Sequence, residues 1–441
     1  MKFLNKILFL GSPSRASFAW GSLFYLAAGM AVAGEEAPLT PINSGDTAWV
    51  LVSAALVMLM TPGLGLFYGG MVRRKNVLAT IMQSFFLVAL IGIQWIAWGY
   101  SVAFSPGNPF FGGLSWGMLN NLGAVSPNAP TIPHPAFVLF QAMFAIITPA
   151  LITGAFAERV KFKGFVLFSL LWATLVYDPV AHMVWGGGFW AQHGGLDFAG
   201  GVVVHITAGF SALTLALLTG RRKGYGTVTM VPHNMTMVMC GTGLLWFGWF
   251  GFNGGSALGA NPQACTAFLA TNTAGAAATL VWCLVEALHR GKPTTFGAAS
   301  GAIAGLAAVT PGAGFVDMTG AICIGAMASL LCYSAILFKL KLGYDDSLDA
   351  FGIHGVGGFW GTLAVGIWAN PLIGRKAGFL YGNAGQFTLQ TLMAVSIALF
   401  SVAATVIIYF AVEKTVGFKA NEKEEDIGLD VSQHGEEGYN Y

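Results

Sequence analysis

DFAGGVVVHITAGFSALTLALLTGRR, residues 197–222, has the composition of a membrane-spanning helix. Its apolar run is about 20 residues long, which is enough to cross the hydrocarbon core of a bilayer. Asp197 stands at its start, His205 lies about two turns further on, and Arg221, Arg222 and Lys223 follow its far end. Because an ionisable ring inside an apolar span is costly, His205 is a candidate functional residue.

The composition of the whole chain agrees with a membrane protein. Of its 441 residues, 55% are hydrophobic and 9% are charged, whereas soluble domains carry about 25% charged residues. The 60 glycines suit closely packed helices in a bilayer. The net charge of +2 does not indicate a nucleic-acid partner. The five cysteines have neither metal-binding spacing nor the pattern of a disulfide framework.

Residues 1–33 have the features of a signal peptide. Lys2, Lys6 and Arg15 precede an apolar run at 16–33, which ends in the cleavage pattern Ala-Val-Ala. An extra first transmembrane helix is the alternative, but the run is short for a span and ends in small residues. Cleavage would leave the new amino terminus outside the cytoplasm, so we expect a bacterial inner-membrane protein.

The remaining chain is a series of apolar segments with short connections, which predicts an all-α polytopic membrane protein. We expect a transmembrane domain over 34–413 with eleven helices. Glycine and proline interrupt several segments, and the eighth segment is the weakest. The segments are 46–71, 77–103, 134–156, 162–181, 199–220, 233–253, 263–287, 295–311, 318–339, 350–370 and 387–413.

Charge in the connections predicts the orientation. Basic clusters such as 73–75 and 221–223 follow the odd-numbered segments, whereas 104–133 and 182–198 hold no Lys or Arg. By the positive-inside rule, the amino terminus lies outside and the carboxyl terminus in the cytoplasm. The pair Arg375-Lys376 is the exception, because it lies in a connection assigned to the outside.

A weak similarity between the two halves of the chain indicates an internal repeat. GLFYGG in the first segment resembles GFNGG in the sixth, and Asp197 before His205 resembles Asp349 before His354 in the tenth. The aspartate precedes the histidine by eight residues in the fifth segment and by five in the tenth. We therefore expect an inverted repeat of five plus five helices, completed by a final helix. Such repeats place transport sites near the bilayer midplane.

The tail at 414–441 is polar and carries seven of the 19 acidic residues. It is either a disordered, solubilising end or, given its predicted cytoplasmic position, a regulatory segment.

Of the eight histidines, only His205 and His354 lie inside apolar segments. Each is either a core histidine bonded to a neighbour or one member of a pair that shares a proton in a dry pore. A metal site is the third alternative, but two histidines without a third ligand make a poor one. We therefore expect neither a metal nor a cofactor.

Asp197 and the aromatic residues also have structural interpretations. A carboxylate at the start of a helix caps free N–H groups and meets the positive end of the dipole, and we favour this role for Asp197 over substrate contact. Trp185, Phe144 and Phe252 cannot be separated from packing aromatics by spacing alone. A cation does bind over an aromatic face, by about 0.5–2 kcal/mol.

Several motifs resemble those of the ammonium transporter family (Amt/Mep/Rh), in its bacterial branch. They are GAFAER at 154–159, WGGG at 185–188, the run from Asp197 to His205, GWFGFNGGS at 248–256, and the run from Asp349 to Gly358. The resemblance covers nearly all of the chain after the signal peptide.

The resemblance implies roles for individual residues. Phe144, Trp185 and Ser256 match an outer ammonium-recruiting site, and Phe144 with Phe252 matches a stacked hydrophobic gate. His205 and His354 match twin pore histidines. The resemblance further implies a homotrimer with one pore per subunit. It also implies a PII-type signalling protein as a partner of the tail.

The sequence thus predicts an ammonium transporter for nitrogen uptake and no enzyme. It would recruit NH4+, deprotonate it near Asp197 and conduct NH3, while the histidine pair carries the proton; K+ would be rejected because it has no proton to give. An ammonium sensor is one alternative, although no kinase or cyclase domain follows the last segment. A gas channel of the Rh branch is another, but Trp185 and Ser256 favour a cation. An intramembrane hydrolase is disfavoured, because the sequence shows neither an activated nucleophile nor a metal constellation.

Overall fold

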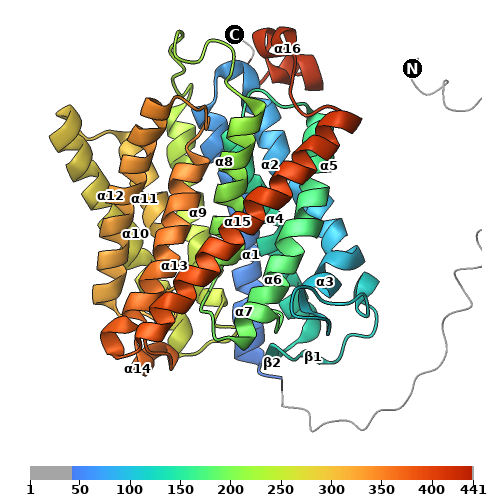
Figure 1. The fold of residues 1–441 in the computed structure, drawn as a ribbon, viewed down its shortest axis with the longest axis vertical. Coiled ribbons are helices and arrows are strands. Elements are labelled where there is room, and N and C mark those ends of the chain that lie inside the picture. The colour runs from blue at the N-terminus through green and yellow to red at the C-terminus, as the bar shows by residue number, and fades with distance from the viewer. Residues whose placement is uncertain (1–41, 440–441) are drawn as a thin grey trace, which may run out of the picture. The chain divides into compact units, whose positions relative to one another are not determined.

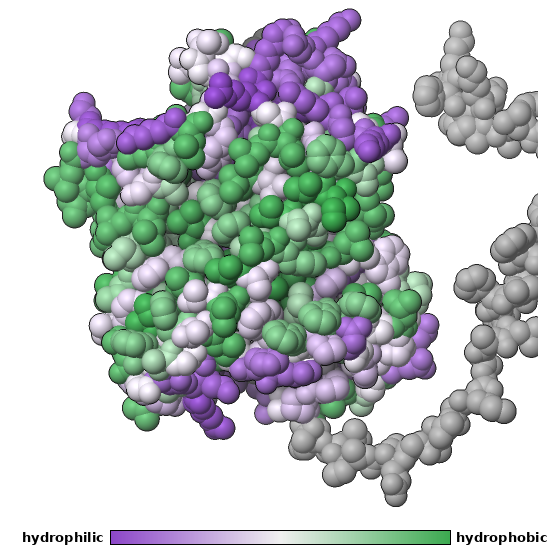
Figure 2. All heavy atoms as spheres, viewed as in Figure 1, coloured by the Kyte–Doolittle hydropathy of each residue, from purple (hydrophilic) through white to green (hydrophobic). Residues whose placement is uncertain are grey.

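The computed structural model describes residues 42–439, which are mainly helical (Figure 1). The expected signal peptide at 1–33 lies outside the described residues. Hydrophobic residues cover the middle of the face seen in Figure 2, and hydrophilic residues gather at its upper and lower ends. This distribution is the one that a protein embedded in a bilayer needs.

Nine helical segments in the described part of the chain are long and apolar enough to span a membrane. The expected segments at 295–311 and 350–370 fall on shorter helices: α11, Thr295–Val309, and a π-helical turn, η7, Phe351–Gly355, that continues into α13, Val356–Trp368. The nine are Ser44–Met71, Arg74–Phe104, His134–Phe156, Phe162–Gln192, Gly201–Thr219, Met235–Gly255, Pro262–Arg290, Met318–Leu342 and Ala384–Thr415.

Several of the nine segments contain more than one helical element. The single-element segments are α1 (Ser44–Met71), α4 (His134–Phe156), α9 (Met235–Gly255), α10 (Pro262–Arg290), α12 (Met318–Leu342) and α15 (Ala384–Thr415). The composite segments contain α2 (Val77–Gln94), α3 (Tyr100–Phe104), α5 (Phe162–Trp172), α6 (Asp178–Val184), α7 (Phe189–Gln192), the π-helical η6 (Gly201–Ile206) and α8 (Thr207–Thr219). A two-stranded antiparallel hairpin, β1 (Val125–Ser126) and β2 (Ala129–Pro133), precedes α4.

Glycines let α1 and α9 lie against each other along their length. A Cβ added at Gly241 would lie 2.4 Å from the backbone nitrogen of Phe67, and one at Gly251 would lie 2.6 Å from Cβ of Leu56. The sequence similarity between the first and sixth segments therefore lies on two helices in direct contact, where small residues allow close approach.

The two histidine-bearing segments cross in a reciprocal way. A Cβ at Gly209 would lie 2.1 Å from the backbone nitrogen of Gly355, and a Cβ at Gly358 would lie 2.5 Å from Cβ of His205. Gly209 follows His205 by four residues, and Gly358 follows His354 by four. Each glycine thus makes room for the other segment at its histidine, which brings the two imidazoles together.

Asp346, not Asp349, is the structural counterpart of Asp197. Asp346 accepts hydrogen bonds from the backbone N–H groups of Ala350 (3.1 Å) and Phe351 (2.9 Å) at the start of η7. It precedes His354 by eight residues, the spacing between Asp197 and His205. Asp349 instead has a positive φ of 59° and pairs with Lys339.

The tail is ordered through residue 439, so the interpretation as a disordered end is wrong for the described residues. It forms a short helix, α16 (Glu422–Ile427), and a π-helical turn, η9 (Asp430–His434). The Asp430 carboxylate accepts the N–H groups of Leu78 (3.1 Å) and Ala79 (2.8 Å) at the start of α2. The tail therefore packs against the end of the helical bundle (Figure 1).

The close crossing at Gly209 predicts that two glycine substitutions differ in their effect on stability. Gly209→Ala forces a methyl group into the backbone of Gly355, so we expect the free energy of unfolding to fall by about 1–3 kcal/mol, as in overpacked cores. Gly243→Ala is the matched control, because a Cβ there meets nothing within 4 Å. Thermal unfolding of both purified variants in detergent measures the difference. Equal midpoints would contradict the close crossing.

Candidate functional site

An outer pocket of about 250 Å³ lies on the side of the bundle opposite the tail. It brings together Phe144 from α4, Trp185 at the end of α6 and Ser256 at the end of α9. The Trp185 and Phe144 rings meet edge to face, with their centroids 6.0 Å apart. The lining residues are Phe104, Asn128, Phe137, Gln141, Phe144, Val184, Trp185, Phe198, Ser256 and Leu258.

Two polar side chains at this pocket already donate hydrogen bonds to backbone oxygens of the protein. The indole N–H of Trp185 donates to the backbone oxygen of Asp197 (2.8 Å), which fixes the ring beside the pocket. The Ser256 hydroxyl donates to the backbone oxygen of Phe252 (2.8 Å). Its oxygen therefore keeps only acceptor capacity for a group in the pocket.

Gln141 is a pocket residue that the sequence analysis missed. It is 8% exposed and lies one turn before Phe144 on α4. Its side-chain oxygen has no hydrogen-bond partner among residues 42–439. A buried amide oxygen without a partner is costly, so Gln141 offers an acceptor to a donor in the pocket. An amide inside an otherwise apolar segment was the signal in the sequence.

Two phenyl rings separate the outer pocket from the interior. The centroids of Phe144 and Phe252 are 4.2 Å apart with an angle of 30° between the planes. Both side chains are 1% exposed. Phe144 lines the outer pocket, and Phe252 lines a smaller cavity beyond it. The two stacked rings therefore lie between the two spaces.

The cavity beyond the rings contains both histidines and measures about 10 Å³, close to the room that one water needs. The His205 and His354 rings lie nearly parallel, with centroids 5.2 Å apart, and the Trp249 ring stacks on His205 at 5.6 Å. Within the described chain, both nitrogens of His205 and Nδ1 of His354 are buried without a hydrogen-bond partner. The other lining residues are Met60, Leu64, Ile147, Leu151, Val204, Leu245, Phe252 and Ile303.

The unpartnered nitrogens argue against a purely structural role for the histidine pair. A core histidine satisfies its ring nitrogens with neighbouring groups, whereas these three nitrogens have no hydrogen-bond partner among residues 42–439. A metal would need further ligands, and no group of three or more His, Cys, Asp or Glu side chains that could hold one occurs within residues 42–439.

Asp197 is a helix cap. Its two carboxylate oxygens accept the N–H groups of Gly200 (2.9 Å), Gly201 (2.6 Å), Val202 (2.8 Å) and Val203 (3.0 Å). Because both oxygens are used within the helix terminus and the residue is 7% exposed, the carboxylate is not directed at the pocket. It acts on the pocket through its backbone oxygen, which holds Trp185.

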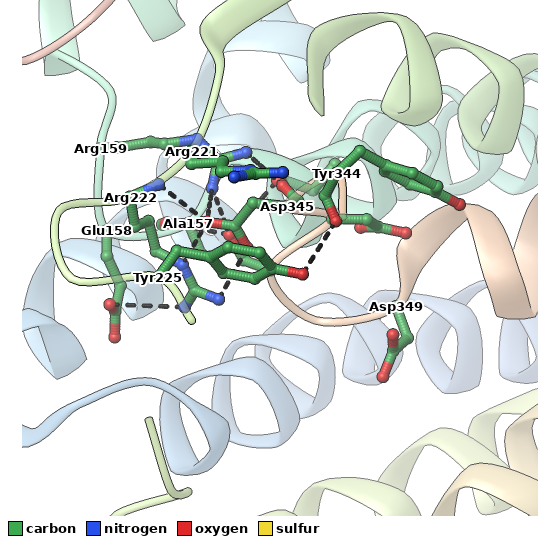
Figure 3. Close-up of polar contacts among 12 residues, drawn as sticks. Ala157, Glu158, Arg159, Arg221, Arg222, Tyr225, Tyr344, Asp345 and Asp349 are labelled. Atoms are coloured by element: carbon green, nitrogen blue, oxygen red, sulfur yellow. Dashed lines mark hydrogen bonds and ion pairs between the residues drawn. The ribbon is translucent and has the colours of Figure 1, made fainter. Parts of the chain in front are cut away.

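A cavity of about 540 Å³ lies at the tail side and is lined by Arg73, Glu158 and Arg222. These residues belong to a network of ion pairs that also includes Arg159 and Asp345 (Figure 3). Asp345 receives two hydrogen bonds of 2.9 Å from Arg222, and Arg159 lies 3.2 Å away. Glu158 pairs with Arg73 (2.6 Å) and Arg222 (3.4 Å). Burial opposes ionisation of Asp345, but the Arg222 hydrogen bonds and the Arg159 charge hold its pKa below the usual value.

This ion-pair network ties together the connections that follow α1, α4, α8 and α12. Removing one partner would leave a buried charge uncompensated, which is strongly destabilising. The sequence analysis used these basic residues only to predict the orientation. Their structural role depends on contacts between connections far apart in the chain.

Comparison with known proteins finds similar sequences that match most of this chain. A model of the Ammonium Transporter Family matches residues 48–439. The ammonium transporter of Bacillus subtilis is 49% identical over 402 residues, covering 90% of this chain and 99% of its own. Ammonium transporter Amt1 of Archaeoglobus fulgidus is 47% identical over 399 residues, covering 90% and 100%.

Solved structures give the same similarity at the level of the fold. The crystal structure of Candida albicans Mep2 matches with a TM-score of 0.83 and 35% identity, covering 87% of this chain and 88% of that one. A structure named Sensor Amt Protein matches with a TM-score of 0.82 and 27% identity, covering 88% and 98%.

Proposed function

The chain belongs to the ammonium transporter family, a family of membrane transporters rather than enzymes, and on this basis we propose how it handles its substrate. It recruits NH4+ in the outer pocket and conducts NH3 past the phenyl gate, while the proton that NH4+ gives up passes to a ring nitrogen of the histidine pair and is carried separately. This proposal rests on the order of three features along the proposed pathway. They are a pocket with hydrogen-bond acceptors, two stacked phenyl rings, and a dry cavity with unpartnered imidazole nitrogens.

Recruitment combines cation–π attraction with hydrogen-bond acceptors. The Trp185 and Phe144 rings offer their π-systems to a cation, an interaction that strengthens as water is removed. The Ser256 oxygen and the Gln141 side-chain oxygen accept N–H donors. This combination favours NH4+ over K+, because only NH4+ can donate hydrogen bonds.

Passage requires the loss of charge. A full charge is expensive in the low-dielectric centre of a membrane, and the gate between Phe144 and Phe252 supplies no polar group to replace lost water. NH3 is neutral and small enough for the cavity beyond. K+ has no proton to leave behind, so the same barrier excludes it.

The histidine pair supplies a route for the proton. A neutral imidazole has one donor and one acceptor nitrogen. The stacked His205 and His354 rings are not hydrogen-bonded to each other, so a molecule in the cavity bridges them to relay a proton, and each ring can bond to NH3 in transit. Asp197 holds the start of the His205 segment and sets the local field. We assign it no direct contact with the substrate.

The topology that we propose has eleven membrane spans, with α11 and the η7–α13 segment added to the nine long ones. The basic connections on the tail side support an outer amino terminus and a cytoplasmic tail, and the reciprocal Asp–His–Gly arrangement supports an inverted repeat. We further propose a cleaved signal peptide at 1–33, a bacterial inner-membrane location, a homotrimer, and regulation through the tail by a PII-type partner.

An ammonium sensor is the second candidate function. It is favoured by the similarity to the structure named Sensor Amt Protein. Uptake of labelled methylammonium by vesicles that contain the purified protein distinguishes the two, because a pure sensor would bind the ion without flux.

The outer pocket predicts the effect of removing its acceptors. We expect Gln141→Leu and Ser256→Ala to raise the half-saturating ammonium concentration about tenfold, since a hydrogen bond to a charged group is worth about 1.5–3 kcal/mol. Trp185→Leu should act in the same direction. Concentration-dependent currents from proteoliposomes measure the effect.

Asn128→Ala is the matched control for these variants, because Asn128 lines the same pocket but is exposed. Its half-saturating concentration should stay at the parental value. If Gln141→Leu and Ser256→Ala also keep that value, their oxygens do not bind the ion.

The histidine pair predicts a change in what crosses the pore. His205→Ala and His354→Ala should reduce ammonium-driven current, because the proton route is broken, and should admit K+ once transfer of a proton is no longer required. Current and K+ flux are measured on purified protein normalised for the amount reconstituted. A structural role predicts less folded protein but unchanged flux per molecule. That result in both variants would place the proton route elsewhere.

A further inference from the structure

Both ring nitrogens of His182, on α6, face backbone oxygens. Nδ1 lies 3.0 Å from the oxygen of Ala103 in α3, and Nε2 lies 2.9 Å from the oxygen of Asn108 in the connection that follows α3. The residue is 3% exposed. These two contacts are the polar surroundings of a buried imidazole that the transport route described above does not use.

The two acceptors decide which form of the ring fits. A carbonyl oxygen can only accept a hydrogen bond, and a neutral imidazole has one donor nitrogen and one acceptor nitrogen. In either neutral form, the lone pair of one ring nitrogen would point at a carbonyl oxygen at hydrogen-bonding distance. The imidazolium avoids this repulsion, because each of its two N–H groups donates to its own oxygen.

The end of a helix favours the same charge. The helical segment Arg74–Phe104 ends one residue after Ala103, so the Ala103 oxygen belongs to the carbonyls that a helix leaves without an internal partner at its end. The carboxyl end of a helix carries a partial negative charge, which attracts a histidine cation. The connections at 104–133 and 182–198 hold no Lys or Arg that could take this place.

Other titratable groups do not bond to this ring. Those on the elements packed against α6 are Tyr100 of α3, Tyr177 of η5 (Ala173–Tyr177), His193 after α7, Asp197 and His205 at η6, and Asp178 of α6 itself. Within residues 42–439, none of them makes a hydrogen bond or an ion pair with the His182 ring. The part of the connection at 105–117 contains no titratable side chain.

The two contacts hold two walls of the outer pocket together. Phe104 ends α3 and Trp185 follows α6, and both line the pocket. Gly186 allows the close approach, because a Cβ there would lie 2.0 Å from the Ala103 oxygen. His182 does not line the pocket, and the negative end of the helix offsets its charge toward a cation bound there.

We propose that His182 is a doubly protonated positioning residue for ammonium recruitment. Its imidazolium ties the end of α3 to α6 and thereby sets the separation of Phe104 and Trp185. Loss of its proton leaves one carbonyl oxygen without a donor and loosens the pocket, so recruitment weakens as the pH rises. This inference rests on the proposed recruitment of NH4+ in the outer pocket.

Nitrogen NMR tests the protonation state independently of transport. The full chain is labelled in its histidine rings and reconstituted in lipid, and the signals that disappear in His182→Gln are assigned to His182. If that variant does not fold, His182→Lys gives the same assignment. At neutral pH, both nitrogens of the assigned ring should be protonated. One protonated and one unprotonated nitrogen would overturn the proposal.

Concentration-dependent currents from proteoliposomes test the positioning role. The amide nitrogen of His182→Gln can reach only one of the two oxygens, so we expect the half-saturating NH4+ concentration to rise about fivefold, the equivalent of one hydrogen bond. The maximal current per molecule should stay the same. His182→Lys, a cation with three donors, should recover part of the affinity. The difference between the parent and His182→Gln should vanish as the pH rises.

His193→Gln is the matched control, because His193 is exposed and its ring bonds to one backbone oxygen, that of Phe189 (2.7 Å). It should keep the parental value at every pH. The positioning role is overturned if His182→Gln keeps the parental half-saturating concentration while Gln141→Leu raises it, even if less protein folds. An equal rise in His193→Gln would also overturn it. Parental values in both His182→Gln and Gln141→Leu would instead overturn recruitment in the pocket, and the positioning role with it.

Discussion

The placement of the two histidines in the proposed pore depends on two carboxylates that cap helix starts inside the bundle. Backbone N–H groups in a membrane protein need internal partners, because the surrounding lipid offers none. Asp197 meets this need for four N–H groups at η6, and Asp346 meets it for two at η7. With these starts fixed, His205 and His354 each lie eight residues further on. The reciprocal glycine contacts then bring the two rings face to face.

The same arrangement explains why polarity decreases along the proposed pathway. The backbone oxygen of Asp197 holds Trp185 at the outer pocket, so the cap of η6 also fixes part of the proposed recruiting site. Polarity then falls from the acceptors of Gln141 and Ser256 to the phenyl gate. A cation is favoured at the first step and disfavoured at the second, which is the condition under which NH4+ gives up a proton.

Apolar length and composition were sufficient to predict most of the helices. The two intramembrane histidines could be identified because the other six histidines lie at the ends of the predicted segments or in the connections. Other features depended on contacts distant in sequence. Asp346 and Asp349 are both aspartates of the same connection, and only the backbone turn and the Asp349–Lys339 pair decide which one caps η7. The order of the tail rests on Asp430, whose partners at 78 and 79 are some 350 residues away. Gln141 became a candidate only when its oxygen was found without a partner.

Ion selectivity of the parent protein is the most direct test of the proposed deprotonation. Tracer fluxes of methylammonium and K+ are measured in proteoliposomes at equal concentrations, with protein-free vesicles as the baseline. If the ion must give up a proton to cross, methylammonium enters well above the baseline and K+ does not exceed it. K+ flux comparable to that of methylammonium would contradict deprotonation, because a cation without a proton would then cross the gate intact.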